Sequence, residues 1–337
     1  MSKILTSEIS KYLNGNSSRK TKEVNLIPLI PPSELLQGAP MNPSIGKDSN
    51  GNIYCTIRTV NYIFYHSRKI LHPFGVLTYC HPENDMKLRT WNLLCDINND
   101  LQPTNFRKID TSLTEAHKSQ WNFIGHEDVR LFEWNERWYV CGIRRDFKPN
   151  GESRMELCEF DVNSATELDR FRIPSTGDDG SYCEKNWMPI TTMPHHFVKW
   201  SNPVEIVKAD PENKTCTTVH LSDKVHPLGY DLRGSSQLIP YEGGFLAVCH
   251  ITRLWKNEIT NTKDSVYRHC FVKYSNEFEV EFITEEFSFL DGDIEFAAGM
   301  IEHNGNFVIS FGYTDNAAFL LEVPKKIVEN LNKVYEN

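Results

Sequence analysis

The amino-acid sequence predicts an all-β protein, and two patterns support this prediction. Apolar runs of strand length recur along the chain between polar or glycine-containing turns. In addition, five segments share one design, with two apolar runs around a polar turn and charged or polar residues at the open ends. These segments are 41–62, 125–146, 183–203, 233–253 and 294–315. Each is expected to form a β-hairpin with polar groups on its open side.

The spacing of these hairpins predicts how they are arranged. The midpoints of their second strands lie 85, 59, 48 and 62 residues apart, at Tyr54, Tyr139, Val198, Leu246 and Val308. These gaps leave room for two more strands per unit, and about four strands in roughly 40–50 residues are typical of propeller blades. The irregular spacing indicates an insertion near residues 62–120. We therefore expect a five-bladed β-propeller, with a β-sandwich carrying long loops as the alternative.

The two ends of the chain interrupt the strand pattern. Residues 1–35 contain prolines that break a long helix or a central strand, so they are expected to form a short irregular N-terminal arm. Residues 323–337 carry Pro324 at a favourable first-turn position and apolar residues at helical spacing, which predicts a C-terminal helix. The propeller domain is then expected to span residues 36–322.

Composition limits the partners that the protein can have. A formal net charge of −9 argues against nucleic acid as the main partner, because phosphate binding needs a basic face. The N-terminal segment lacks an apolar run of signal-peptide length, and no run of about 18 apolar residues occurs in the chain. No membrane span and a cytoplasmic location are therefore expected, while the oligomeric state stays open.

Cysteines and short motifs narrow the chemistry. The nine cysteines are scattered and include no C-x-x-C pair, so reduced and mostly buried thiols are expected. No spacing typical of a dedicated metal site appears, and neither a metal nor a cofactor is predicted. The chain also lacks the P-loop, G-x-G-x-x-G, G-x-S-x-G and H-E-x-x-H motifs, which leaves kinases, dinucleotide-dependent dehydrogenases, serine esterases and zincins without support.

The polar residues at the open hairpin ends are the candidate site residues. In a propeller the innermost strands open into a central funnel, so the polar groups of all units meet there, whereas a sandwich gives no reason for their regular placement. Carboxylates, amides and aromatic rings together suit a carbohydrate, and a carboxyl group can protonate a glycosidic oxygen. The candidates are Asn42, Arg58, Asn61, Glu127, Asp128, Arg130, Glu184, Lys185, Asn186, Trp187, Lys199, Arg233, His250, Glu295 and Asp315.

Several of these segments resemble motifs of the five-bladed propeller enzymes of glycoside hydrolase family 130, the mannoside phosphorylases and related hydrolases. E-D-V-R-L-F at 127–132 resembles the family's E-D-P-R, and E-K-N-W-M-P at 184–189 is similar to its K-N-x-x-x-x-P-E. K-W-S-N-P at 199–203 is similar to its H-R-P segment. G-G-F-L-A-V-C-H resembles G-W-L-x-x-Y-H-G, and S-F-G-Y-T-D at 310–315 resembles Y-G-A-A-D. The likeness keeps this order over roughly residues 40–320.

This resemblance implies roles for individual residues. It makes Asp128 the catalytic general acid or base at the leaving oxygen of a mannose-like glycoside, and it makes Arg130, Lys185, Asn186 and Asp315 ligands of sugar hydroxyls. Lys199 and Trp200 stand where the family has a phosphate-binding His-Arg pair, which weighs against phosphorolysis. Four functions stay open for an oligosaccharide or glycan ligand: hydrolysis, phosphorolysis with inorganic phosphate, transfer from a nucleotide sugar as in related propeller mannosyltransferases, and glycan binding without catalysis.

Overall fold

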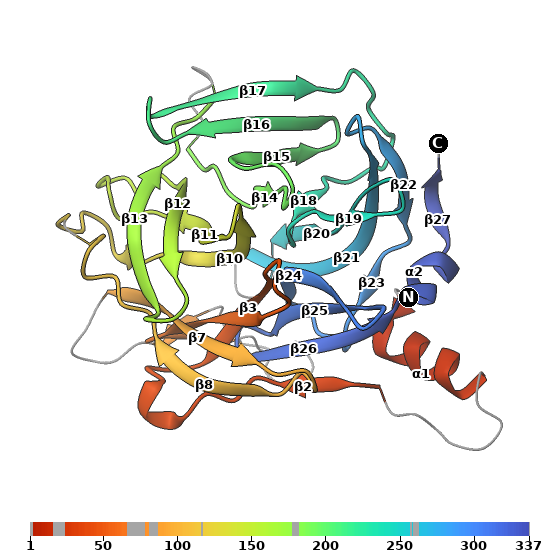
Figure 1. Ribbon diagram of the computed structural model, residues 1–337, viewed down its shortest axis with the longest axis horizontal. Coiled ribbons are helices and arrows are strands. Elements are labelled where there is room, and N and C mark those ends of the chain that lie inside the picture. The colour runs from red at the N-terminus through yellow and green to blue at the C-terminus, as the bar shows by residue number, and fades with distance from the viewer. Residues whose placement is uncertain are drawn as a thin grey trace.

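The protein is a propeller of β-sheets. The computed structural model describes residues 3–15, 24–65, 78–80, 87–115, 117–176, 182–256, 258 and 263–336. Its sheets are set around a common centre, as Figure 1 shows in a view down the shortest axis of the molecule. The all-β propeller predicted from the hairpin pattern is thereby confirmed. No described helix is long and apolar enough to cross a membrane.

Four of the sheets are compact and contain four or five strands each. The first consists of β3 (Pro40–Lys47), β4 (Ile53–Val60), β7 (Leu88–Ile97) and β8 (Pro103–Lys108), with β9 (Phe123–Ile124) beside β7. The second consists of β10 (Glu127–Trp134), β11 (Arg137–Arg144), β12 (Arg154–Asp161) and β13 (Thr166–Arg172). The third consists of β14 (Met188–Pro189), β15 (His196–Ser201), β16 (Val204–Asp210) and β17 (Thr215–Leu221). The last consists of β24 (Glu295–His303), β25 (Asn306–Tyr313), β26 (Ala317–Pro324) and β2 (Leu26–Pro28).

An eight-stranded sheet lies between the third and the last of these. It contains β18 (Arg233–Gly234), β19 (Ile239–Tyr241), β20 (Gly244–Lys256), β21 (Lys263–Ser275), β22 (Val280–Thr284), β23 (Phe287–Ser288), β1 (Lys3–Ile4) and β27 (Lys333–Glu336). Four sheets therefore have the compact form of a propeller blade, one fewer than the five predicted, and the eight-stranded sheet contains the remaining predicted hairpin. The hairpins themselves appear as the antiparallel pairs β3–β4, β10–β11, β14–β15, β19–β20 and β24–β25.

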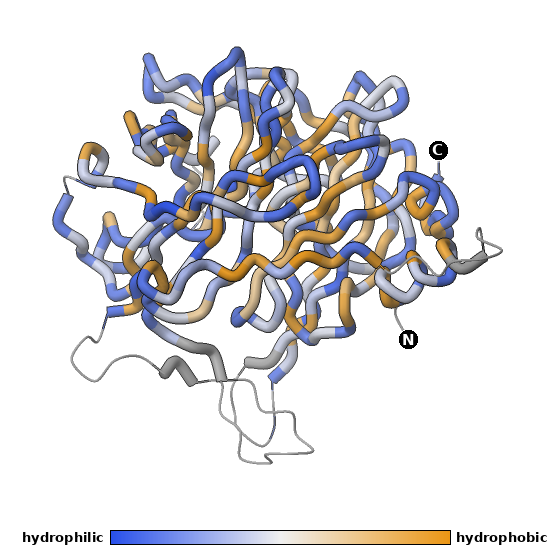
Figure 2. The backbone as a smooth tube through the Cα atoms, turned by 60° about the horizontal axis from the view of Figure 1, so that its bottom comes forward, coloured by the Kyte–Doolittle hydropathy of each residue, from blue (hydrophilic) through white to orange (hydrophobic). Residues whose placement is uncertain are grey.

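The core consists of clusters packed between neighbouring sheets. Successive side chains of a strand point to opposite faces, so Leu131 of β10 lies in one buried cluster with Leu94 of the first sheet. Phe132, the next residue, lies instead in a cluster with Phe197 of the third sheet. Three further clusters join the third sheet to the eight-stranded one, that sheet to the last, and the last to the first. The ring of sheets is thus closed by packing, and Figure 2 shows hydrophobic stretches along the interior strands.

The N-terminal arm is more regular than the sequence predicts. It contains α1 (Leu5–Gly15), which buries Leu5 and Ile9 in the core, and a short 3-10 helix at Ser33–Leu35. β1 pairs with β23, and β2 pairs with β26. β2 occupies the outer edge of its sheet, where Pro28 is tolerated because an edge strand does not need every backbone N–H.

The C-terminal helix is present but shorter than predicted. α2 (Lys325–Asn330) ends before Leu331, whose backbone is extended, and β27 then pairs with β22. The last residues have helical spacing but form a strand, because the edge of β22 is available for pairing. Val334 is therefore 53% exposed instead of packed against the body. The predicted insertion near 62–120 coincides with β5 (Ile63–Tyr65) and β6 (Thr78–Cys80), a two-stranded sheet. Residues 66–77 and 81–86 of that stretch lie outside the described residues.

Candidate active site

A polar cavity of about 200 Å³ lies where the sheets meet, and it is lined by residues of the first, second, eight-stranded and last sheets and by Lys185 and Asn186, which precede β14. Its described lining consists of Met41, Asn42, Arg58, Tyr62, Phe123, Glu127, Asp128, Ile143, Arg145, Lys185, Asn186, Arg233, His250, Tyr267, Phe296 and Asp315. Nine of these were candidates from the sequence: Asn42, Arg58, Glu127, Asp128, Lys185, Asn186, Arg233, His250 and Asp315. The open ends of the hairpins therefore do converge on one cavity.

Irregular backbone turns several of these side chains into the cavity. Asn42, Asp128, Asn186 and Asp315 have positive φ angles of 42°, 49°, 64° and 50°. The pairing of β3 with β4 shifts register between Met41 and Ser44, and that of β10 with β11 shifts between Glu127 and Arg130. Such bulges re-aim a side chain at the end of a strand, and Asn and Asp tolerate the left-handed conformation better than most residues. Strained positions of this kind gather at functional sites.

Asp128 is held as a carboxylate. Its Oδ1 atom accepts hydrogen bonds from Arg58 Nη1 and from Asn42 Nδ2, both at 2.8 Å. Burial alone would raise the pKa of Asp128, but the Arg58 guanidinium and the Asn42 amide outweigh burial and lower this pKa below its usual value. Asp128 is therefore ionised at neutral pH.

Arg58 organises both acids at the start of β10. This arginine is only 5% exposed, and its Nη2 atom donates to Glu127 Oε2 at 3.0 Å and to the Tyr62 hydroxyl at 2.7 Å. Thr90 Oγ1 accepts from the same guanidinium. Burial raises the pKa of Glu127, and the nearby Arg58 only partly offsets that rise. The pKa values of the two adjacent acids are thus shifted in opposite directions, upward for Glu127 and downward for Asp128.

Asp315 has the opposite environment to Asp128. Within the described part of the chain, no hydrogen bond or ion pair to its carboxyl group is found. Burial raises the pKa of Asp315 to about 6; Arg58 opposes the rise and the negative charge of Asp128 adds to it. The cavity therefore holds one carboxyl group whose pKa is lowered and another that loses its proton only near pH 6.

The cavity also holds cationic groups that form no direct ion pair with a described carboxylate. Arg58 pairs with both acids of β10, but Arg145, Lys185 and Arg233 form no ion pair among the residues described. Arg145 donates from Nε to the Gly151 carbonyl and lies over the Phe123 ring. Cationic side chains in a partly buried site favour an anionic ligand such as a phosphate group.

His250 contributes a neutral ring to the same cavity. Its Nδ1 atom lies 2.9 Å from the Ser235 hydroxyl. Burial, together with the cationic groups and His269 nearby, lowers the pKa of His250 well below its ordinary value, so the imidazole is uncharged at neutral pH. A neutral ring can donate from one nitrogen and accept at the other.

Six of the candidates lie outside the described lining. Trp187 is 1% exposed and packs in the core between the second and third sheets, so it offers no face to a sugar. Glu184 accepts from Trp187 Nε1 and lies 3.6 Å from Lys199 Nζ, and Lys199 also bonds Thr176. Trp200 is 47% exposed and does not line the cavity either. These residues support the third sheet.

The other three of the six hold backbone. Arg130 is fully buried and donates to the carbonyl oxygens of Asp128 and Ser235, which makes it a positioning residue for Asp128. Glu295 accepts from the backbone N–H groups of 289, 290 and 292. Asn61 donates to Lys87 O and accepts from the N–H of Arg89.

The sequence pattern missed part of the lining. The aromatic rings at the cavity are Tyr62, Phe123, Tyr267 and Phe296, rather than the tryptophans. Tyr62 follows β4 and Tyr267 lies on β21, a strand outside the predicted hairpins. Arg145 could have been found, because it stands in the charged cluster that ends the hairpin 125–146.

No protein-family model matches the sequence, and no curated relative is found. Solved structures resemble the chain in fold. One is β-1,2-mannobiose phosphorylase from Listeria innocua in complex with β-1,2-mannobiose, at 12% identity and TM-score 0.55, covering 90% of this chain and 95% of that one. Another, at 12% identity and TM-score 0.55 with 86% and 85% covered, belongs to the GH130 mannoside phosphorylases, a family that contains hydrolases of β-1,2-mannosidic linkages in Candida mannan. A mannose phosphorylase from Leishmania mexicana in complex with phosphate has 10% identity, TM-score 0.50, and 98% and 96% covered. At these identities the likeness establishes the propeller fold alone.

Proposed function

We propose that this protein is a carbohydrate-active enzyme that cleaves or transfers a mannose-like glycosyl unit in the central cavity. The observation that carries the proposal is a pair of carboxyl groups in one cavity, Asp128 and Asp315, whose pKa values are shifted in opposite directions. Two acids whose environments push their pKa values apart are typical of glycoside chemistry, which needs a proton donor and a carboxylate. The fold neighbours named above are mannoside phosphorylases and hydrolases, which favours a mannose-like sugar.

The two acids then take different roles. Asp315 protonates the glycosidic oxygen as the bond to the leaving group breaks, because it is the acid that still carries a proton near pH 6. Asp128, held ionised by Arg58, stabilises the positive charge that develops on the sugar or accepts a proton from the incoming nucleophile. This assignment gives Asp315 the acid role that the sequence resemblance implied for Asp128.

The co-substrate in this proposal is a phosphate group. Arg145, Lys185 and Arg233 offer cationic donors at the lining of the cavity. They replace the Lys199 and Trp200 pair, which lies outside the lining. Phosphorolysis of a mannoside is therefore favoured, and transfer from a nucleotide sugar is the second candidate, because it also brings phosphate to the site.

The test is a product search by mass spectrometry. The protein is incubated with β-1,2-mannobiose and other β-mannosides, with and without inorganic phosphate, and separately with nucleotide sugars and mannose acceptors. We expect mannose 1-phosphate that depends on added phosphate. Free mannose without phosphate would indicate hydrolysis, and a glycosylated acceptor would indicate transfer. Saturable sugar binding by calorimetry with no product in any mixture would contradict catalysis and favour a glycan-binding propeller.

The pH profile tests the role of Asp315. The rate on the substrate found above is expected to fall as pH rises through about 6, because the raised pKa of Asp315 means that this acid loses its proton there. Asp315→Asn should lower the rate about 10²-fold or more and remove that limb of the profile. Asp169→Asn, on the second sheet, is the control and should leave the profile unchanged. A wild-type rate that stays level from pH 5 to 8 would contradict the assignment.

A further inference from the structure

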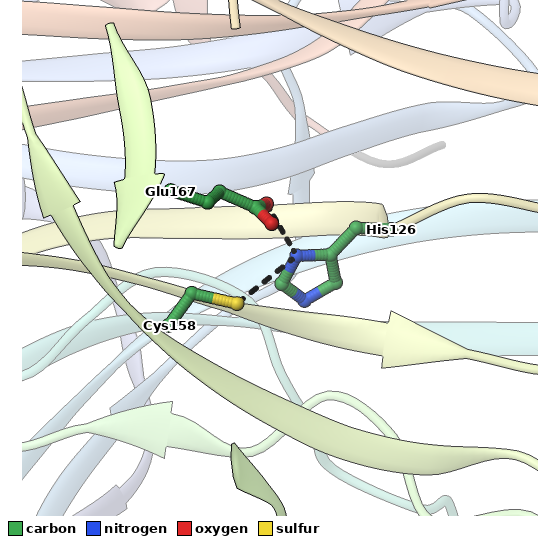
Figure 3. Close-up of side chains that lie close together, drawn as sticks. All are labelled: His126, Cys158 and Glu167. Atoms are coloured by element: carbon green, nitrogen blue, oxygen red, sulfur yellow. Dashed lines mark hydrogen bonds and ion pairs between the residues drawn. The ribbon is translucent and has the colours of Figure 1, made fainter. Parts of the chain in front are cut away.

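A second cluster of reactive side chains lies behind the strand that carries the two adjacent acids. His126 directly precedes Glu127, and its ring meets Cys158 of β12 and Glu167 of β13 (Figure 3). His126 Nδ1 lies 3.5 Å from Glu167 Oε1 and 4.0 Å from Cys158 Sγ. The potential ligand atoms all lie within 4.8 Å of one another, and the three residues are 3%, 2% and 0% exposed in the order His126, Glu167, Cys158. Neither catalytic role proposed above uses any of them.

We propose that His126, Cys158 and Glu167 bind a divalent transition metal of the zinc class. Zinc binds imidazole, thiolate and carboxylate at about 2.0–2.3 Å, so tetrahedral ligand atoms lie roughly 3.3–3.8 Å apart. The distances from His126 Nδ1 are close to that range, and side-chain shifts of less than about 1 Å would complete it. A nitrogen and a sulfur ligand together select zinc, cobalt or a similar metal over magnesium and calcium.

The surroundings orient these ligands. Glu167 Oε2 accepts from Thr114 Oγ1 at 2.6 Å and from the Arg170 guanidinium, which leaves Oε1 directed to His126. The His126 carbonyl accepts from Asn92 Nδ2 at 2.8 Å and fixes the backbone of the histidine. Outer partners of this kind hold the first ligands of natural metal sites in place.

A separate cavity adjoins the cluster at His126. This cavity has a volume of about 490 Å³ and lies beside β7 and β8 of the first sheet, and His126 is part of its lining with Asn92 and Glu115. Water from this side can supply a fourth ligand, as three-ligand zinc sites require. The proposed site is therefore buried among strands yet adjacent to an open path.

The charge balance of the cluster permits a metal. Arg170 is a competing cation beside Glu167, but Glu156, which lies 3.4 Å from Arg170 Nε and 3.1 Å from Arg172, offsets the arginines with a second carboxylate. When the metal binds, the Cys158 thiol loses its proton to solvent and becomes a thiolate, so binding releases a proton and weakens as the pH falls. The bound metal would tie β12 and β13 to the residue before Glu127, and this inference does not depend on the proposed function.

The test uses metal analysis and a cobalt spectrum of the whole chain. Protein from zinc-supplemented cells should contain about one zinc per chain, since one cluster is proposed. After treatment with a chelator, Co²⁺ should produce a thiolate-to-cobalt absorption band, and Zn²⁺ should remove the band and raise the Tm. Cys158→Ala should lose the band and the zinc, whereas Cys141→Ala, a buried cysteine on neighbouring β11 outside the cluster, should keep both.

The wild-type spectrum alone decides the matter if Cys158→Ala does not fold. A wild-type protein with far less than one zinc per chain and no thiolate-to-cobalt band would overturn the proposal. A band that persists in Cys158→Ala would equally overturn it, because another thiol such as exposed Cys183 would then be the ligand. Glu167→Gln provides a second variant, and it should weaken Co²⁺ binding at least about tenfold while keeping the thiolate band.

Discussion

Asp128→Asn is expected to lower the turnover number by about 10³-fold or more, because an amide can neither accept a proton nor stabilise developing positive charge. The folded state should change little. The asparagine oxygen can still accept from Arg58 and Asn42, and Arg58 keeps its ion pair with Glu127, so no buried charge is left without a partner. We expect a Tm within about 3 °C of the wild type, as for a loss near 1 kcal/mol in a chain of this size.

This experiment needs a comparison that separates chemistry from binding. Steady-state rates on the substrate from the product search give kcat and KM for the wild type and for Asp128→Asn, and a thermal melt gives the Tm of each. The loss should lie in kcat, since the interaction is strongest in the transition state. Asp169→Asn again serves as the control. If Asp128→Asn keeps more than about a tenth of the wild-type kcat, Asp128 is not a catalytic residue.

Arg58→Met is expected to destabilise the fold by about 3–5 kcal/mol at pH 7, because it leaves the partly buried Glu127 and Asp128 without their shared cation. Methionine keeps much of the volume, so the loss reports charge more than packing. Arg137→Met is the matched control: its ion pair with Glu159 is exposed, and removing it should cost at most about 1 kcal/mol. Urea unfolding at pH 7 measures both differences. A loss in Arg58→Met no larger than that in the control would contradict the central role of Arg58.

The pH dependence of this difference follows from the lowered pKa of Asp128. A carboxyl group whose pKa is lower in the folded state adds stability above its unfolded pKa of about 3.9, and this stability is lost as pH falls through the folded pKa. The wild-type protein should therefore lose its advantage over Arg58→Met as the pH is lowered below about 4, because protonated acids no longer need the arginine. A gap that stays constant from pH 7 to pH 3 would show that Arg58 acts through packing alone.

Strand architecture could be predicted from the sequence because its signals are local. Apolar runs separated by Asn-Gly or Glu-Gly-Gly turns identify hairpins without knowledge of the partner strands. The convergence of Asn42, Asp128, Lys185 and Asp315 followed from the equivalent places of these residues in repeated units. That argument used only the place of each residue in its hairpin. The nine candidates in the cavity are those whose side chains also point toward it.

Orientation and long-range pairing could not be predicted in the same way. Trp187 and Glu295 occupy the expected chain positions, yet Trp187 points into the core and Glu295 accepts backbone N–H groups. Successive residues of a strand point to opposite faces of the sheet, so a shift of one residue decides whether a side chain faces the cavity. Tyr267 reaches the cavity from β21, a strand outside the predicted hairpins, whereas Arg145 directly follows β11 at the end of the predicted hairpin 125–146. The strand at Lys333–Glu336 depends on the free edge of β22, a partner about fifty residues away along the chain.

The closed ring of buried clusters has a consequence for how the cavity keeps its width. Each sheet packs against the two sheets beside it, and the packing distances between all neighbouring sheets together set the circumference of the ring. A larger or smaller side chain in any one cluster therefore changes the spacing of the walls that carry Asp128 and Asp315, even from far outside the cavity. The distance between the two acids therefore depends on the packing of every sheet in the ring.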